Sequence, residues 1–242
     1  MRLLAIETST EACSVAVSVD GDIRERHALA PRRHADLVLP WAEALLAEAG
    51  ISRSRLDGIA VGRGPGAFTG VRLGISIAQG IALALDLPLL PESTLAVLAA
   101  GARVEDEGTG AGGAHILAAI DARMGEVYAA AFVRDASGLH PLGPEVVAAP
   151  DAVARPPGGP WLGVGTGFAA AECALQRGLG ARLASVDATA LPHAADLARL
   201  AAVSLATGGG IAPERVEPAY LRDNVALTLA EQAAARQGPR LS

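Results

Sequence analysis

The sequence predicts an α/β protein built from two similar lobes, each with a mixed sheet flanked by helices. Three observations support this prediction. Residues 1–100 read as three strands followed by helix, strand, helix, strand and helix, and the three-strand pattern starts again after residue 113. The stretch between them, 101–113, is rich in glycine and charge, as a lobe boundary would be. The length of 242 residues, 51% of them hydrophobic, supplies a sizeable core for one large domain or two small lobes.

The first half of the chain opens with strand patterns and continues with alternating helices and strands. Residues 3–6 are apolar, and residues 13–19 alternate in the manner of a half-buried strand. Asp20-Gly21 predicts a hairpin turn into a third strand at about 23–29. The remaining elements are expected as a helix at 33–49 that Gly50 ends, a strand at 56–61, a long helix at 69–85, a strand at 87–90 and a helix from Ser93 to about 100.

The second half repeats this order. Its elements are expected as strands at 115–120, 127–133 and 139–147, a loop at 155–160, a strand at 161–164 and helices at 168–177 and 194–206. Glu7 and Asp121 stand at matching places, because each follows the apolar run of its half's first strand. A duplicated unit of this kind is the plan of the actin, Hsp70 and sugar-kinase (ASKHA) superfamily. We therefore expect an N-terminal lobe at 1–105 and a C-terminal lobe at 106–242, whose C-terminal segment is a candidate to pack back on the first lobe.

Composition narrows the classes of function. The formal net charge is −6, from 20 basic and 26 acidic residues, and every basic residue is arginine, which excludes lysine chemistry. An acidic chain without a basic run lacks the charge distribution of a stand-alone nucleic-acid-binding protein. Two cysteines cannot form a disulfide framework, so a cytoplasmic location is expected. The longest apolar stretch is shorter than the ~20 residues of a membrane span, so no membrane contact is expected.

Two charged or hydroxyl-rich turns are candidates for chemistry. Glu7, Thr8, Ser9 and Thr10 follow the first strand, where hydroxyls can hold a phosphate and a carboxylate can hold hydrated Mg²⁺. An ordinary polar turn, with its hydroxyls bonded to the local backbone, is the favoured interpretation of the residues alone. In the second half, Asp121, Arg123 and Glu126 either line a cleft between the lobes or form a surface ion-pair cluster. The sequence does not separate these two alternatives.

The glycine-rich segment 61–70 joins a strand to the long helix. Gly62, Gly64 and Ala67 match G-x-G-x-x-A, but three strands precede them, and Asp86 precedes the next apolar run instead of ending it, so a dinucleotide site is not expected. A tight loop in which backbone packs against backbone explains the segment better.

The helix at 69–85 carries two rows of small residues at four-residue spacing. The rows are Gly70, Gly74, Ala78 and Ala82, and Ser76, Gly80 and Ala84. Small residues let another backbone approach closely, and the aliphatic positions between them indicate burial on more than one side. The helix is therefore expected either to lie inside the chain or to be shared between the sheet and a second protein chain.

Patterns for metal and nucleophilic catalysis are missing from the sequence. None of the five histidines lies three or four residues from another, so no helix can present a two-histidine metal face. Neither a G-x-S-x-G nor a Walker pattern occurs. No catalytic or metal-binding residue is therefore assigned.

Four stretches carry a family resemblance over nearly the whole chain: LLAIETSTEACSVAV, GIAVGRGPGAFTGVRLGISIAQGIALALDLPLL, AAIDARMGEVYAA and EPAYLRDN. They closely resemble the bacterial TsaB (YeaZ) family, which implies the actin-like two-lobed fold. The family serves in making threonylcarbamoyladenosine at position 37 of tRNAs that read codons beginning with A. The resemblance implies that the transferase is a paralogous partner, TsaD, that the ATPase TsaE joins them, and that tRNA is met through the complex.

The resemblance also implies a non-catalytic role for this chain. TsaD-like proteins carry a metal-binding His-x-x-x-His where this sequence has PESTLAVLAAGA, without histidine. A transferase that polarises its substrate with a metal cannot work without those ligands. The expected function is a scaffold that activates TsaD. The alternative is an independent actin-like kinase or ATPase that holds Mg-ATP with Glu7, Thr8, Ser9 and Asp121.

The family's pairing mode implies a partner interface on the helices at 33–49 and 69–85. The residues carried over are Leu37, Trp41, Phe68, Gly70, Leu73, Gly74 and Ile77. In isolation the same face is expected to form a homodimer. The degraded nucleotide or phosphate site is expected at Glu7, Thr8, Ser9, Thr10, Asp121 and Arg123. No cofactor is assigned to this chain alone, and ATP or ADP is expected only at a composite site with partners.

Overall fold

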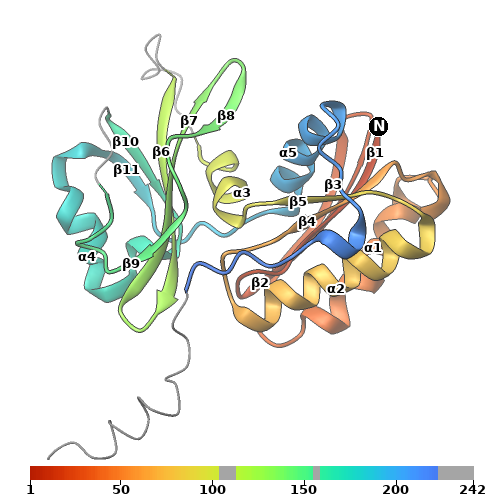
Figure 1. Cartoon of the computed structure of the whole chain (residues 1–242), viewed down its shortest axis with the longest axis horizontal. Coiled ribbons are helices and arrows are strands. Elements are labelled where there is room, and N and C mark those ends of the chain that lie inside the picture. The colour runs from red at the N-terminus through yellow and green to blue at the C-terminus, as the bar shows by residue number, and fades with distance from the viewer. Residues whose placement is uncertain (104–112, 155–158, 223–242) are drawn as a thin grey trace, which may run out of the picture.

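The first lobe is built on a sheet that mixes antiparallel and parallel strands (Figure 1). The computed structural model describes residues 1–103, 113–154 and 159–222. The strand order is β3-β2-β1-β4-β5, in which β1 runs antiparallel to β2 and parallel to β4. The strands are β1 (Arg2–Glu7), β2 (Ala12–Val19), β3 (Asp22–Leu29), β4 (Gly58–Gly62) and β5 (Leu89–Glu92).

Helices cover both faces of this sheet because its strands are apolar on both sides. Side chains alternate along a strand, so Leu4 and Ile6 of β1 pack with α1 and α2, while Leu3 and Ala5 pack with α5 on the other face. The helices of the first half are α1 (His34–Glu48), α2 (Phe68–Leu85) and α3 (Thr94–Ala100), and α5 (Ala194–Ala206) comes from the second half. The predicted start of α3 is confirmed, because Ser93 Oγ accepts hydrogen bonds from the N–H groups of Leu95 and Ala96.

The second lobe repeats the mixed sheet, as predicted. Its order is β11-β10-β6-β7-β8, with β9 paired to β7. The strands are β6 (Ala114–Arg123), β7 (Glu126–Asp135), β8 (Gly138–Pro141), β9 (Val146–Ala148), β10 (Trp161–Val164) and β11 (Leu183–Asp187). Helix α4 (Ala170–Leu179) packs on one face, and α3 packs on the other face, between the two lobes in Figure 1. The predicted two-lobed α/β fold is confirmed.

Three local predictions for the second half differ from the structure. The strand expected at 139–147 is two strands, β8 and β9, because Gly143 and Pro144 interrupt it and proline cannot donate to a ladder. The helix expected at 168–177 begins as a 3-10 turn at Thr166–Phe168 before α4. Strand β11 was not predicted, since it is a partly exposed edge strand without an apolar run.

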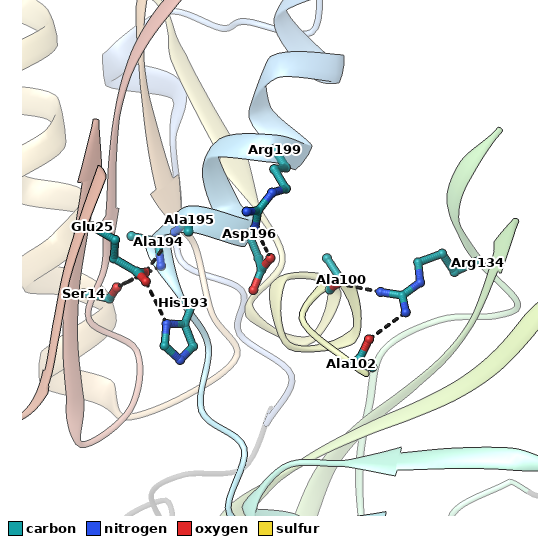
Figure 2. Close-up of polar contacts among 10 residues, drawn as sticks. All are labelled: Ser14, Glu25, Ala100, Ala102, Arg134, His193, Ala194, Ala195, Asp196 and Arg199. Carbon is teal, nitrogen blue, oxygen red and sulfur yellow. Dashed lines mark hydrogen bonds and ion pairs between the residues drawn. The ribbon is translucent and has the colours of Figure 1, made fainter. Parts of the chain in front are cut away.

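Helix α5 is anchored on the first lobe by polar contacts at its N-terminus (Figure 2). Glu25 of β3 accepts hydrogen bonds from the Ser14 hydroxyl at 2.7 Å and the Ala195 N–H at 3.0 Å, and His193 Nδ1 lies 3.0 Å from Glu25 Oε2. The Ser14 Oγ in turn accepts from the Ala194 N–H at 2.9 Å. The second half of the chain therefore supplies a helix to the first sheet.

The segment 207–222, after α5, stays with the first lobe before it reaches the gap between the lobes (Figure 1). Ile211 forms an antiparallel β-bridge with Leu89 of β5. The Gln79 side chain of α2 donates hydrogen bonds to the Pro213 and Val216 carbonyls. The Ala219 N–H then donates to the Arg63 carbonyl at 2.8 Å. The expected lobe boundary at residue 105 lies outside the described residues.

Arg134 adds polar contacts to the apolar packing between the second lobe and α3. Arg134 of β7 donates to the Ala100 carbonyl at 2.7 Å and to the Ala102 carbonyl at 2.6 Å, and Figure 2 shows the guanidinium at the C-terminal end of α3. Carbonyls at a helix C-terminus have no partner within the helix, so a cation is favourable there. This contact and the buried Leu95, Leu98 and Ala99 together hold α3 against the second sheet.

Among the described residues, α2 is the one helix whose length and apolar composition match a membrane span. Core helices pass the same test, and α2 packs on the first sheet through Val71, Ile75 and Ala78. The match therefore does not indicate a membrane span.

Candidate functional site

The hydroxyl-rich turn after β1 is buried and bonded within the protein. The Thr8 hydroxyl donates to the Gly70 carbonyl at 2.8 Å, and the Thr94 hydroxyl lies 3.0 Å from Ser9 Oγ. The Thr10 hydroxyl oxygen accepts from the Ala12 N–H at 3.3 Å. Of these three contacts, the one made by Thr10 is local, as in an ordinary polar turn, whereas Thr8 and Ser9 bond to α2 and α3 at sequence separations of 62 and 85 residues.

Glu7 does not fit a hydrated Mg²⁺ site in this structure. The residue is 1% exposed. Its Oε1 accepts a hydrogen bond from the Ser9 N–H at 2.7 Å, and its Oε2 lies 3.4 Å from Thr94 Oγ1. Burial raises the pKa of Glu7, partly opposed by these hydrogen bonds. A side chain at Gly62 would place its Cβ 1.9 Å from Glu7 Oε2, so the carboxylate occupies the space that this glycine leaves.

Glycines of the 61–70 segment and of α2 let the chain pass closely over this turn. A Cβ at Gly66 would lie 2.2 Å from the Ser9 carbonyl oxygen, and a Cβ at Gly70 would lie 2.1 Å from that of Thr8. A Cβ at Gly74 would lie 2.5 Å from Thr8 Oγ1. The segment is therefore a close backbone contact, as the sequence indicated, and its glycines are required by their neighbours within the chain.

The β6–β7 turn holds Asp121, Arg123 and Glu126. The two alternatives predicted for them, a cleft lining and an ion-pair cluster, each hold in part. Asp121 and Arg123 pair with each other at 3.0 Å and line a cleft between the lobes. Glu126 instead pairs with Arg222, which also donates to the Ala122 carbonyl.

The cleft has a volume of about 580 Å³ and receives residues from both lobes and from the segment 218–222. Ser9 and Thr10 of the expected phosphate site line it together with Asp121 and Arg123, whereas Glu7 and Thr8 do not. The structure thus brings four of the six expected residues to one cleft and leaves two of them beneath the glycine-rich segment. No group of three potential metal ligands occurs within the described residues.

The two rows of small residues on α2 face opposite directions. Gly70, Gly74, Ala78 and Ala82 are buried against the sheet, whereas Ser76, Gly80 and Ala84 are exposed. The assignment of Gly70 and Gly74 to a partner interface is therefore wrong, because both pack against Thr8 inside the lobe. The outward row is the one that can admit a second chain.

An apolar groove of about 590 Å³ lies between α1 and α2 on the outside of the first lobe. Ser76, Gly80 and Ala84 form part of its wall, together with Ile77 and with Leu39, which is 48% exposed. Of the expected interface residues, Ile77 lines the groove, and Leu37, Trp41 and Leu73 are half-buried. Phe68 is 67% exposed but lines the interlobe cleft.

Leu39 and Glu43 are groove residues that the sequence analysis did not single out. Their four-residue spacing on α1 was visible in the sequence, but Glu43 is charged and neither residue belongs to the apolar stripe. The outward side of a helix carries no strong signal when only its buried side is periodic.

Known proteins resemble this chain over almost its full length. A family model described as TsaD, tRNA N6-adenosine threonylcarbamoyltransferase, matches residues 28–229. The tRNA threonylcarbamoyladenosine biosynthesis protein TsaB of Escherichia coli (strain K12) is 44% identical over 231 residues, which are 93% of this chain and 96% of that protein. TsaB of Haemophilus influenzae is 36% identical over 234 residues, which are 93% of this chain and 95% of that protein.

A solved structure supports the same assignment. YeaZ from Pseudomonas aeruginosa is 42% identical, with a TM-score of 0.81, and the match covers 91% of this chain and 99% of that one. Sequence and fold agree over both lobes. The chain belongs to the TsaB (YeaZ) family.

Proposed function

We propose that this protein is a non-catalytic subunit that pairs with a TsaD-type transferase in the threonylcarbamoylation of adenosine 37 in tRNAs reading ANN codons. Its curated relatives are named as threonylcarbamoyladenosine biosynthesis proteins. The match to a family model named for the transferase supports a shared fold between the two subunits. Two subunits with one fold can pair through equivalent helices, as symmetric protein interfaces do.

The observation that carries the proposal is the groove between α1 and α2. Its lining is mostly aliphatic, and the outward row of Ser76, Gly80 and Ala84 leaves α2 without bulk, so a partner helix can approach closely. Leu83, which is 61% exposed, adds apolar surface on the same helix. An open apolar groove of this kind indicates a protein interaction site.

The polar turn supports the non-catalytic part of the proposal. Glu7 and Thr8 are committed to contacts inside the first lobe, so they are not presented to a substrate in the cleft. The α3 stretch stands where the resemblance implies the metal-binding histidines of TsaD-like proteins, and it contains no histidine.

Pairing is tested by mixing the purified chain with a TsaD homologue and measuring the size of the complex. Gly80→Arg is the test variant, because a Cβ at Gly80 meets no atom within 4 Å and the fold is left intact. Val203→Arg is the control, since Val203 is 66% exposed on α5, across the sheet from the groove. We expect Gly80→Arg to abolish the complex and Val203→Arg to retain it. A complex of unchanged size with Gly80→Arg contradicts the assigned face.

The same proposal extends to the other expected partners. In the absence of TsaD, the groove would serve a homodimer, so Gly80→Arg should convert a dimer into a monomer. TsaE, and ATP or ADP with it, would bind at a composite surface of the assembled subunits in the cytoplasm.

The alternative, an independent Mg-ATP-dependent kinase or ATPase, draws support from one observation. Ser9, Thr10 and Asp121 line one interlobe cleft. Calorimetry with Mg-ATP separates the two proposals: a kinase binds nucleotide without a partner, whereas a scaffold chain alone releases no binding heat.

A further inference from the structure

The interlobe cleft concentrates the aromatic residues of a chain that has few. Only 3% of the residues are aromatic, yet both tyrosines, Tyr128 and Tyr220, line this cleft with Phe68. Phe68 is 67% exposed and Tyr220 is 57% exposed, and Met124 at the adjacent β6–β7 turn is 87% exposed. Exposed side chains of this size at one opening indicate a binding surface.

One arginine, Arg72, lies beside two of these aromatic rings. The Arg72 guanidinium carbon lies 3.3 Å from the centre of the Phe68 ring and 4.9 Å from that of Tyr220, and Arg72 also donates to the Tyr220 hydroxyl. Phe68, Arg72 and Tyr220 therefore present two aromatic rings and one guanidinium group side by side, and unpaired bases stack on groups of these kinds in protein complexes with RNA.

The charge of the cleft differs from that of the whole chain. Its lining carries three arginines, Arg72, Arg123 and Arg222, and two carboxylates, Glu11 and Asp121. Arg222 also pairs with Glu126, so the cleft is close to neutral on a chain of net charge −6. The Arg123 side chain is 84% exposed, so it is available to a phosphate despite its contact with Asp121. Without a cationic excess, the site suits a single phosphate better than an extended anionic strand.

We propose that the mouth of this cleft holds an unpaired nucleotide of an RNA loop, with the base on the exposed Tyr220 ring, beside Arg72 and Phe68, and a phosphate near Arg123. A cleft of about 580 Å³ lies within the range of sites that enclose one small ligand. The inference rests on the proposed function, because the chain meets tRNA only within the complex. It adds a direct contact where the sequence implied an indirect one.

The test measures RNA affinity of the complex with a TsaD homologue by fluorescence anisotropy. The probe is a labelled RNA hairpin with an unpaired, adenosine-containing loop, and a fully paired RNA of the same length is the comparison. Tyr220→Ala removes the ring, whereas Tyr220→Phe keeps the ring and removes only its hydroxyl contact with Arg72. Arg123→Gln is matched with Arg199→Gln, an arginine on α5 that is 62% exposed.

We expect Tyr220→Ala to weaken hairpin binding by about 5- to 150-fold, the effect of losing one stacked base. Tyr220→Phe and Arg199→Gln should stay within about twofold of wild type, and Arg123→Gln should weaken binding and lower its salt dependence. Ultraviolet crosslinking of the wild-type complex should join the loop to the peptides of Phe68, Met124 or Tyr220, a result that needs no variant.

Three outcomes overturn this inference. They are equal affinity of wild type and Tyr220→Ala, crosslinks confined to TsaD, and full displacement of the hairpin by AMP, which would mark a free-nucleotide site. Complex size is recorded for every variant. Loss of the complex with wild-type protein contradicts the proposed function, whereas an intact complex with unchanged RNA affinity contradicts the RNA contact alone.

Discussion

Gly74 and Gly80 lie on the same helix but in opposite environments. A Cβ at Gly74 would lie 2.5 Å from Thr8 Oγ1, whereas a Cβ at Gly80 would meet no atom within 4 Å. Helix propensity favours alanine over glycine equally at both positions, so their difference reports packing alone.

We expect Gly74→Ala to lower the free energy of unfolding by about 1–3 kcal/mol, because the added methyl group overpacks the buried turn. Gly80→Ala should raise it by about 0.5–1 kcal/mol through helix propensity. Urea denaturation of both variants provides the comparison. Equal changes in the two variants would show that Gly74 does not pack as described.

The buried Glu7 carboxylate should make the stability of the protein depend on pH. Burial raises its pKa above the ordinary value of 4.5, so the folded state binds this proton more readily than the unfolded state does. Its contribution to stability is therefore complete below about pH 4.5 and decreases as the pH rises through the raised pKa. Glu7→Gln should remove this decrease and stabilise the protein at neutral pH.

The measurement is thermal unfolding across the pH range, with Glu11→Gln, an exposed glutamate of the same turn, as the matched control. A Glu7→Gln protein that loses stability at neutral pH relative to wild type would indicate that the ionised carboxylate is needed, as a metal ligand would be.

At the scale of elements, the Glu25–His193 pair adds a charged contact to the apolar packing of α5 on the first sheet. Burial acts to raise the pKa of Glu25, but hydrogen bonds from His193, Ala195 and Ser14 outweigh it and lower the pKa to about 2. The hydrogen bond to Glu25 raises the pKa of His193 above 6.5, against partial burial. His27, stacked on His193 at 4.0 Å, has its pKa lowered by burial and by the charge of His193.

These shifts define a pH window for the pair. The contribution of His193 to the free energy of unfolding is complete below about pH 6.5 and is lost as the pH rises through the raised pKa of His193. The contribution of Glu25 to the same free energy is lost as the pH falls from about 4.5 toward 2. We expect His193→Gln to destabilise the protein more at about pH 6 than at about pH 9, measured as the difference from wild type in urea unfolding. A difference that is independent of pH would show that the pair does not anchor α5 through charge.

The sequence predicted the elements whose periodicity reports burial and missed those whose position depends on distant partners. Strands β1 and β2 and helix α2 have strong apolar patterns, and all three were placed correctly. Strand β11 is an edge strand with exposed residues, so its pattern was weak. The place of α5 on the first sheet depends on Glu25 and Ser14, about 170 residues earlier in the chain, which no local pattern reveals.

The candidate sites show the same limit. Both rows of small residues on α2 were visible in the sequence, but two rows of similarly small residues do not indicate which one faces the sheet. The structure decides this through Thr8, whose carbonyl and hydroxyl oxygens require Gly70 and Gly74. Likewise, Tyr220 and Arg72 are 148 residues apart, so their shared cleft could be found only from the fold.

At the scale of the whole molecule, two lobes are held together while their two exposed sites stay separate. Arg134 of the second sheet donates hydrogen bonds to the C-terminal end of α3. Arg63 Nη2 of the first lobe lies 3.7 Å from Glu145 Oε2 of the second lobe. The groove between α1 and α2 lies on the outside of the first lobe, and the cleft lies between the lobes. One subunit can therefore bind a partner at the groove while the cleft remains open.

The central claim is that this chain is needed for tRNA modification without performing the chemistry. The most direct measurement is mass spectrometry of threonylcarbamoyladenosine in tRNA incubated with threonylcarbamoyl-adenylate, TsaE, ATP and either this chain, a TsaD homologue, or both. We predict efficient modification only with both proteins, retained by Glu7→Gln and lost with Gly80→Arg. Modification by this chain without TsaD, or its loss in a folded Glu7→Gln protein that still pairs with TsaD, would contradict the account.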